Sequence, residues 1–315
     1  MPDLAVLAGA VLVALGLDVA FGEPPARLHP VVAMGHYLGA AGRCVSRQAG
    51  AGARPAVEFL AGSVAWCLGA LLVVTVAVVL VMAMQGWPPL WQLALLGLVL
   101  KPMLSWRMLR DEVRAVEAAL AESLPAGRAR VGRLVSRDVA SLNEARVREA
   151  AVSTLAENLN DSVVAPLFWF AVAGLPGAAL YRFANTADAM WGYRGERGGR
   201  DWSWAGKWAA RADDVLSWLP ARLTALLIAA PSRWRNWGAV VANAALTPSP
   251  NGGWPMGALA EELGVRLGKP GVYELNRHGR VPASADTGQA LRRCGSVVAM
   301  LAGVATVALA AGVVR

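Results

Sequence analysis

The chain has 315 residues, of which 56% are hydrophobic and only 17% are charged. Ordinary soluble domains carry about 25% charged residues, so this composition favours a membrane protein, and its apolar content excludes a largely disordered chain. The formal net charge of +8 fits loops that face the cytoplasm and anionic lipid. No zinc-finger, RNP-type or basic-helix pattern accompanies that charge, so no nucleic-acid partner is expected.

The beginning of the chain is apolar over residues 4–22, with one charged residue, Asp18. A signal peptide has positive residues before its apolar core, and none precede this stretch, so we expect a retained helix. The three cysteines, Cys44, Cys67 and Cys294, are odd in number and far apart. Neither a disulfide framework nor a CxxC metal site is therefore expected.

Further apolar segments are long enough for transmembrane helices, which need about 20 residues. No charged residue occurs from 59 to 100, and the Gly86–Pro89 turn predicts a hairpin of helices over about 57–84 and 89–105. The apolar stretches 162–181 and 215–231 contain prolines, which predicts broken or re-entrant helices. Residues 295–314 form an uninterrupted span.

Between these segments, residues 106–160 are predicted to form a helical insert. Trp106, Leu109, Val113, Val116 and Leu120 recur at three- and four-residue steps, which is typical of an amphipathic helix. A second helix is predicted to begin at Ser141, with Glu144 completing a capping box.

Positive residues set the orientation, because Arg and Lys concentrate in cytoplasmic loops. They place the insert at about 106–160 and loops at about 181–214 and 232–294 on the cytoplasmic side, with the N-terminus outside. We therefore predict an all-α, polytopic protein of the cytoplasmic (inner) membrane. It forms a single domain over residues 1–315, embedded in the lipid bilayer, with broken or re-entrant helices and cytoplasmic amphipathic helices.

Polar residues gather in four blocks at the edges of apolar segments. They include Glu157, Asn158 and Asp161; Asn185, Asp188, Tyr193, Glu196 and Arg197; Arg211, Asp213, Asp214 and Arg222; and Asn251. Oxygen ligands of this kind suit Mg²⁺, which often bridges to substrate phosphates. Arginine suits phosphate or carboxylate. The competing interpretation of each block is a solvated cap or a helix-end ion pair. No P-loop, H-E-x-x-H or G-x-S-x-G pattern occurs.

The same blocks resemble the CobD/CbiB family of cobalamin biosynthesis over nearly the whole chain. The matching motifs are the segment from Asp18 to Gly35, Arg137-Asp138, A-E-N-L-N-D-S-V-V-A-P-L-F at 156–168, N-T-A-D-A-M-W-G-Y at 185–193, R-A-D-D-V at 211–215, W-L-P-A-R-L-T-A at 218–225, S-P-N-G-G-W-P at 249–255 and the segment from Leu263 to Gly268. Glu23 and Ala189 depart from the family's usual Asp and Ser.

The resemblance implies an adenosylcobinamide-phosphate synthase, a carbon–nitrogen ligase. Such an enzyme joins adenosylcobyric acid to 1-amino-2-propanol or its phosphate, with Mg²⁺ as cofactor and ATP as co-substrate. The carboxylates are then metal ligands or a base: Glu157, Asp161, Asp188, Asp213 and Asp214, with all but Asp213 predicted to bind Mg²⁺. Arg197, Arg211 and Arg222 would bind phosphates, and Asn158, Asn185, Tyr193, Glu196 and Asn251 would contact substrates.

Three alternatives stay open at this point. A non-catalytic AmpE-like membrane sensor would be expected to lack several acidic blocks. A prenyltransferase would need two D-x-x-x-D-type clusters, which the Asn185-to-Asp188 and Asp213-Asp214 segments match poorly. A transporter would use the broken helices without forming an amide. Other membrane-bound enzymes of the cobalamin pathway are candidate partners. The sequence does not determine the aminoalcohol or the oligomeric state.

Overall fold

The computed structural model describes residues 3–136 and 138–313. Arg137, half of the Arg137-Asp138 motif, lies outside the described residues. The protein is all-α, as the sequence predicts, and the strands of the described residues are two or three residues long. The chain divides into two compact units, each assembled from separate stretches of sequence. The single domain predicted over residues 1–315 is still a prediction.

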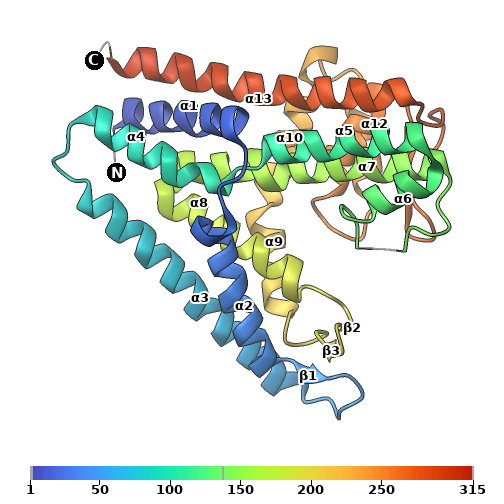
Figure 1. Cartoon of the computed structure of the whole chain (residues 1–315), viewed down its shortest axis with the longest axis horizontal. Helices are drawn as coiled ribbons and strands as arrows, with labels where there is room; N and C mark the ends of the chain where they lie inside the picture. The colour runs from blue at the N-terminus through green and yellow to red at the C-terminus, as the bar shows by residue number, and fades with distance from the viewer. Residues whose placement is uncertain (1–2, 137, 314–315) are drawn as a thin grey trace. The chain divides into compact units, whose positions relative to one another are not determined.

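The first unit contains residues 1–104, 165–217 and 305–315. Its helices are α1 (Leu4–Phe21), η1 (Ala26–Leu28), α2 (Pro30–Val45), α3 (Pro55–Ala83), α4 (Pro89–Leu100), η2 (Lys101–Met103), α8 (Ala165–Trp191), α9 (Lys207–Leu216) and the end of α13 (Ser284–Val313). Within this unit α1 packs against α4, and α2 and α8 pack against α3 (Figure 1). Strands β1 (Arg47–Gln48), β2 (Glu196–Arg197) and β3 (Arg200–Asp201) form a small antiparallel sheet.

Helix α3 has the surface of a membrane-spanning helix. Its 29 residues extend about 44 Å at 1.5 Å per residue, which exceeds the hydrocarbon thickness of roughly 30 Å. Large apolar side chains along it are exposed, among them Leu60, Leu71 and Val79. Since such a surface is unfavourable in water, it indicates contact with lipid tails.

The second half of the predicted hairpin is shorter than expected. Helix α4 ends at Leu100 after 12 residues and passes into the 3₁₀ turn η2, so it is too short for a span. Pro102 cannot donate a backbone hydrogen bond. The ammonium of Lys101 is buried and lies 3.4 Å from Oδ1 of Asp18. The prediction of a helix over 89–105 was therefore wrong at its C-terminal end.

Helix α8 has the interruption that its prolines and glycines predict. Backbone angles leave the helical region at Ala173 and Gly174, where Gly174 has a positive φ of 63°. Pro176 follows the break and lies inside the second part of the helix. Glycine adopts a positive φ at little cost because it has no Cβ, so Gly174 permits the change of direction.

The second unit contains residues 105–164 and 218–304. Its helices are α5 (Trp106–Glu122), α6 (Leu124–Val131), α7 (Glu144–Leu159), η3 (Asn160–Val164), α10 (Trp218–Ala229), η4 (Ala230–Ser232), α11 (Trp237–Ala244), α12 (Gly253–Leu263) and the first part of α13. Strands β4 (Leu267–Lys269) and β5 (Tyr273–Leu275) form an antiparallel hairpin. Helix α7 packs against α5, α12 and β4.

Helix α5 confirms the amphipathic pattern. Its buried residues are Trp106, Leu109, Val113, Val116 and Leu120, which are the apolar positions of the predicted stripe. The predicted capping box at Ser141 was wrong. The N-cap of α7 is Asn143, whose Oδ1 accepts from the backbone N–H of Arg146 at 2.9 Å. Asn caps a helix as well as Ser does, and Asn143 immediately precedes the first helical residue.

The two regions predicted as loops contain helices as well as loops. Residues 181–214 hold the end of α8 and most of α9, and residues 232–294 hold α11, α12, the β4–β5 hairpin and the start of α13. Hydropathy alone missed these helices because they are short or carry charge. Within the described residues, four helices are long and apolar enough to cross a membrane, or five if the broken pair α9–α10 counts as one span. Which loops face the cytoplasm stays a prediction.

Candidate functional site

The first polar block lies at a change of helix type in the second unit. Helix α7 ends at Leu159 and continues as a π-helical turn over Asn160–Val164. Such turns are rare and occur frequently at functional sites. The buried Asn160 side chain accepts from Oγ1 of Thr224 at 3.0 Å and donates to Oδ1 of Asp161 at 2.8 Å. This bridge fixes the orientation of the Asp161 carboxylate against α10.

A polar cavity of about 160 Å³ lies on the neighbouring face of α7. Its walls include Glu157 and Asn158, together with Ser153, Thr154, Lys269 and Tyr273. Glu157 is exposed and also approaches the fourth block, because a Cβ built on Gly252 would lie 3.2 Å from its Oε1. The first and fourth blocks therefore meet within this unit, as a shared site requires.

Arg222 and Asn251 also meet in the second unit. Nη1 of Arg222 donates to Oδ1 of Asn251 at 3.3 Å and to the backbone carbonyl of Trp218 at 2.7 Å. The guanidinium lies over the rings of Trp218 and Trp254, 4.0 Å and 4.6 Å from their centres. Planar stacking and a directed hydrogen bond are properties of arginine that lysine does not share.

The second and third blocks meet in the first unit, where α8 packs against α9. Nδ2 of Asn185 donates to Oδ1 of Asp213 at 3.4 Å. Asp188 lies one turn after Asn185, and a Cβ on Gly192 would lie 1.9 Å from Oδ1 of Asp188. Only a glycine therefore fits at position 192 without displacing this carboxylate. Asp214 is half-buried and interacts electrostatically with Arg211 and Arg194.

The remaining residues of the second block are more exposed. The hydroxyl of Tyr193 donates to the carbonyl of Ala189 at 2.9 Å, and the guanidinium of Arg197 lies 4.1 Å from the centre of its ring. Glu196 and Arg197 form strand β2, with Glu196 opposite Asp201. Hydrogen bonds from the Ser203 side chain and backbone, aided by Arg47, outweigh burial and lower the pKa of Asp201.

The described side chains do not form a complete metal site by themselves. Among residues 3–136 and 138–313, no three His, Cys, Asp or Glu side chains are grouped so that they could hold a metal ion. The donor chemistry still fits Mg²⁺, which is commonly held by one or two carboxylates, water and the phosphates of a substrate. Asp188 and Asp213 lie on packed helices of the first unit, and Asp161 has its orientation fixed in the second. The magnesium prediction stays a prediction.

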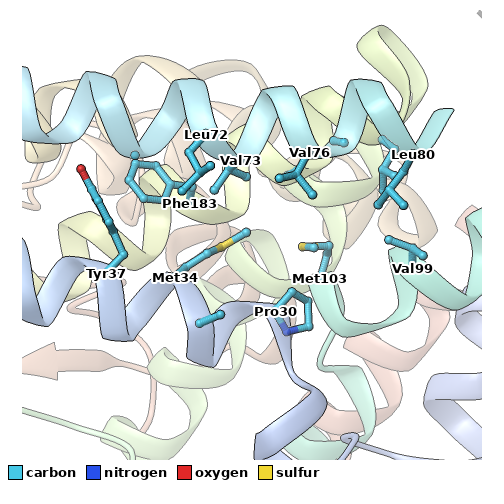
Figure 2. A pocket seen from close by; sticks show the side chains of 15 residues that line it. Pro30, Met34, Tyr37, Leu72, Val73, Val76, Leu80, Val99, Met103 and Phe183 are labelled. Carbon is cyan, nitrogen blue, oxygen red and sulfur yellow. The ribbon is translucent and has the colours of Figure 1, made fainter. Parts of the chain in front are cut away.

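A second cavity is apolar and contains none of the predicted site residues. It measures about 250 Å³ and lies in the first unit, where side chains of α2, α3, α4 and α8 converge. Figure 2 shows Met34 and Tyr37 of α2 facing Leu72, Val73 and Val76 of α3. None of the described residues in its wall is charged, so these residues offer no group for binding a carboxylate or a phosphate.

Sequence reasoning missed two groups of polar residues. Lys269, Tyr273 and Ser153 line the polar cavity, and only the Pro270-Gly271 turn signal marked the hairpin that supplies the first two. Lys101 lies 3.0 Å from Oε2 of Glu23, which also lies 3.1 Å from Nε2 of His29. Together with Asp18 these side chains join α1, η2 and the start of α2. The sequence signal for this second group is that Asp18 and Lys101 each lie at the end of an apolar stretch.

Comparison with known proteins agrees with these motifs. The family model described as CobD/Cbib protein matches residues 11–311. The chain belongs to the CobD/CbiB family. A probable cobalamin biosynthesis protein CobD from Thermococcus kodakarensis is 39% identical over 302 residues, which are 96% of each chain.

Two bacterial members of the CobD/CbiB family are similarly close. The cobalamin biosynthesis protein CobD of Stutzerimonas stutzeri is 41% identical over 284 residues, covering 86% of this chain and 85% of that protein. The protein of the same name from Rhodobacter capsulatus is 39% identical over 272 residues, covering 84% and 83%. No solved structure matches this member of the family.

Proposed function

We propose that this CobD/CbiB protein is a cobalamin-pathway ligase that forms an amide between adenosylcobyric acid and an aminoalcohol or its phosphate. The observation that carries the proposal is the family match over residues 11–311, with curated relatives of nearly the same length named for cobalamin biosynthesis. The meeting of Glu157 with Gly252 in the second unit, and of Asn185 with Asp213 in the first, supports the predicted grouping of these residues within each unit.

The proposed reaction has two steps. The propionate oxygen of the corrinoid takes the γ-phosphoryl group of ATP, giving an acyl phosphate and ADP. The amine nitrogen then attacks the acyl carbon, inorganic phosphate leaves, and a carboxylate accepts the proton that the nitrogen loses. Bound Mg²⁺ would neutralise phosphate charge, with Asp188 and Asp214 of the first unit as its candidate ligands.

Arginines in this proposal bind the anionic groups. Arg222 is half-buried, and its guanidinium is oriented by two indole rings and Asn251. It therefore presents its remaining N–H groups in one direction, toward a phosphate or propionate. Arg197 and Arg211 are exposed and carry the same proposed role in the first unit. We propose that these residues face the cytoplasm, where ATP and the corrinoid intermediate occur.

The test is turnover by the purified protein in detergent. Adenosylcobyric acid, ATP-Mg and either 1-amino-2-propanol or its O-phosphate are supplied, and the corrinoid product and ADP are quantified together. The proposal expects one ADP for each amide. Absence of the amide with active, folded protein would overturn it, and transport of a corrinoid into vesicles without ATP cleavage would favour a transporter.

A further inference from the structure

The polar cavity of the second unit has a definite wall on α7. Ala150, Ser153, Thr154, Glu157 and Asn158 recur at three- and four-residue steps, so they share one face of the helix. Four of these five side chains are polar. On the opposite wall, Lys269 and Tyr273 are direct cross-strand partners in the β4–β5 hairpin, which places their side chains on the same face.

This hairpin is fixed to α7 by charge. The carboxylate of Glu149 is fully buried, 2.6 Å from Nη1 of Arg146 on α7 and 3.8 Å from Nε of Arg266 before β4. Arg266 also lies 3.1 Å from Oε1 of Glu274 on β5. The two walls of the cavity are therefore held at a set distance, as a preformed binding site requires.

Two groups in the wall are without partners. Ser153 is only 6% exposed, and its buried hydroxyl has no hydrogen-bond partner among the described residues. Lys269 forms no ion pair with any side chain that the structure describes. An unpaired buried hydroxyl is destabilising, and a polar ligand in the cavity would supply its partner.

The charges in the wall have both signs. Glu157 is an anion near the C-terminal end of α7, and Lys269 is a cation on the facing hairpin. Such a pair suits a ligand that carries an ammonium at one end and a phosphate or hydroxyl at the other. The volume of about 160 Å³ suits a small aliphatic molecule and lies below the range of roughly 300–1,000 Å³ that is usual for larger ligands.

We infer that this cavity binds the small amine substrate. The ammonium lies at Glu157 and Asn158, and the hydroxyl or phosphate lies at Ser153 and Lys269. The inference rests on the proposed function and deepens it, because it assigns Glu157 to the amine instead of the metal. It also adds Ser153, Lys269 and Tyr273 as determinants of which aminoalcohol is accepted.

The experiment measures binding and turnover separately. Calorimetric titration of the purified full chain with 1-amino-2-propanol and with its O-phosphate, with and without ATP-Mg, gives the two affinities. Lys269→Met should weaken binding of the phosphate ester roughly tenfold or more, and the free aminoalcohol much less. Ser153→Val should weaken both ligands. In turnover the same variants should raise KM for the amine and leave KM for adenosylcobyric acid unchanged.

Matched controls lie in the first unit. Lys207→Met removes an ammonium that stacks on Trp204, and Ser63→Val removes a hydroxyl bonded within its own helix. Neither change should alter amine binding. Because Ser153→Val fills space next to the core, its unfolding temperature is measured as well, and Lys269→Met on the half-buried hairpin provides the second, independent variant.

The possible results separate this inference from the proposed function. Wild-type affinities for both amines in Lys269→Met and Ser153→Val would overturn the inference, even if the protein makes the amide. No saturable binding of either amine to the wild-type protein would also overturn it. Binding that depends on Lys269 and Ser153 without any amide formation would support the cavity and overturn the proposed reaction.

Discussion

Arg222 donates from Nη1 to Oδ1 of Asn251 at 3.3 Å, which joins α10 to the loop before α12. The two residues are 29 positions apart in sequence. Trp218 and Trp254 flank the same guanidinium. A side chain that only extended toward the membrane surface would not need two ring contacts and an amide partner. This arrangement favours a role for Arg222 in binding an anion.

Arg222→Lys tests that role. Lysine keeps the positive charge and nearly the length but loses the planar, multi-donor head. We expect normal membrane insertion and roughly a 10- to 100-fold loss of kcat/KM, mainly through KM for a phosphate-bearing substrate. Steady-state kinetics in detergent provide the measurement. Arg235→Lys, at an exposed position of the same unit, is the control, and unchanged kinetics for Arg222→Lys would remove Arg222 from the site.

Asp188→Asn and Asp214→Asn test the predicted metal ligands. Each change keeps the side-chain shape and removes the charge that a divalent cation requires. We expect turnover to fall by at least about 100-fold, with little change in the unfolding temperature. Turnover measured across a Mg²⁺ titration shows whether each variant has lost a metal ligand. The exposed surface residue Asp111, changed to Asn, serves as control, and a variant with normal activity and an unchanged Mg²⁺ dependence identifies a structural carboxylate.

Gly192→Ala tests whether close packing holds Asp188 in place. The added methyl group would lie 1.9 Å from Oδ1 of Asp188, so the carboxylate must move. We expect a loss of stability of about 1–3 kcal/mol and a larger loss of turnover than of substrate binding. Thermal unfolding and kinetics are measured together. Gly195→Ala has open space around the new methyl group, and equal effects of the two changes would count against a specific role for Gly192.

Much of the membrane architecture follows from sequence, because hydropathy and helical periodicity are local properties. The bounds of α1 and the buried stripe of α5 agree with the predicted ones within a few residues. The π-helical turn at Asn160–Val164 and the burial of Lys101 after the end of α4 do not follow in this way. Both involve partners far along the chain, Thr224 in one case and Asp18 in the other.

The same contrast applies to the candidate site. Acidic and amide residues near apolar segments marked Glu157, Asp188 and Asn251 as candidates. The facing wall of the polar cavity could not be found, since Lys269 and Tyr273 belong to a short hairpin whose position is set by the buried Glu149. A buried carboxylate between two arginines has no periodic signature in the sequence.

We expect the ion pair and hydrogen bonds of Glu117 to make the stability of the protein depend on pH. Burial by itself would raise the pKa of this carboxyl, but hydrogen bonds from Arg148, Thr287 and Ser284 outweigh it, so its pKa lies below the usual value. The contribution of the Glu117 carboxylate to stability is therefore complete above about pH 4.3, the pKa of a glutamate in the unfolded chain. It is lost as the pH falls through the lower pKa of Glu117 in the folded protein.

Glu117→Gln should consequently lower stability by roughly 1–2 kcal/mol at neutral pH and have a diminishing effect below about pH 4. Tryptophan fluorescence during thermal unfolding in detergent, at a series of pH values, provides the readout. The exposed Glu122, changed to Gln, is the control on the same helix. A difference between wild type and Glu117→Gln that does not vary with pH would contradict the prediction.

The orientation in the membrane can be tested by cysteine labelling. Cys44 and Cys67 are exposed and are first replaced, whereas Cys294 is buried and can stay. Cysteines at Ala140 and Arg277, both exposed, should react only after the inner face of the membrane is opened. A cysteine at Trp87, in the turn between α3 and α4, should react in intact cells. Reaction of the cysteines at Ala140 and Arg277 in intact cells would overturn the cytoplasmic placement of the site.

The π-helical turn at Asn160–Val164 makes the length of this segment as important as its composition. A π turn contains one residue more than an α turn, so every later side chain in it is rotated from its α-helical direction. Val163 and Val164 are buried with that rotation in place. A deletion of one residue here would keep the helix but turn these valines outward, so variation in the family should occur here by substitution and not by changes in length.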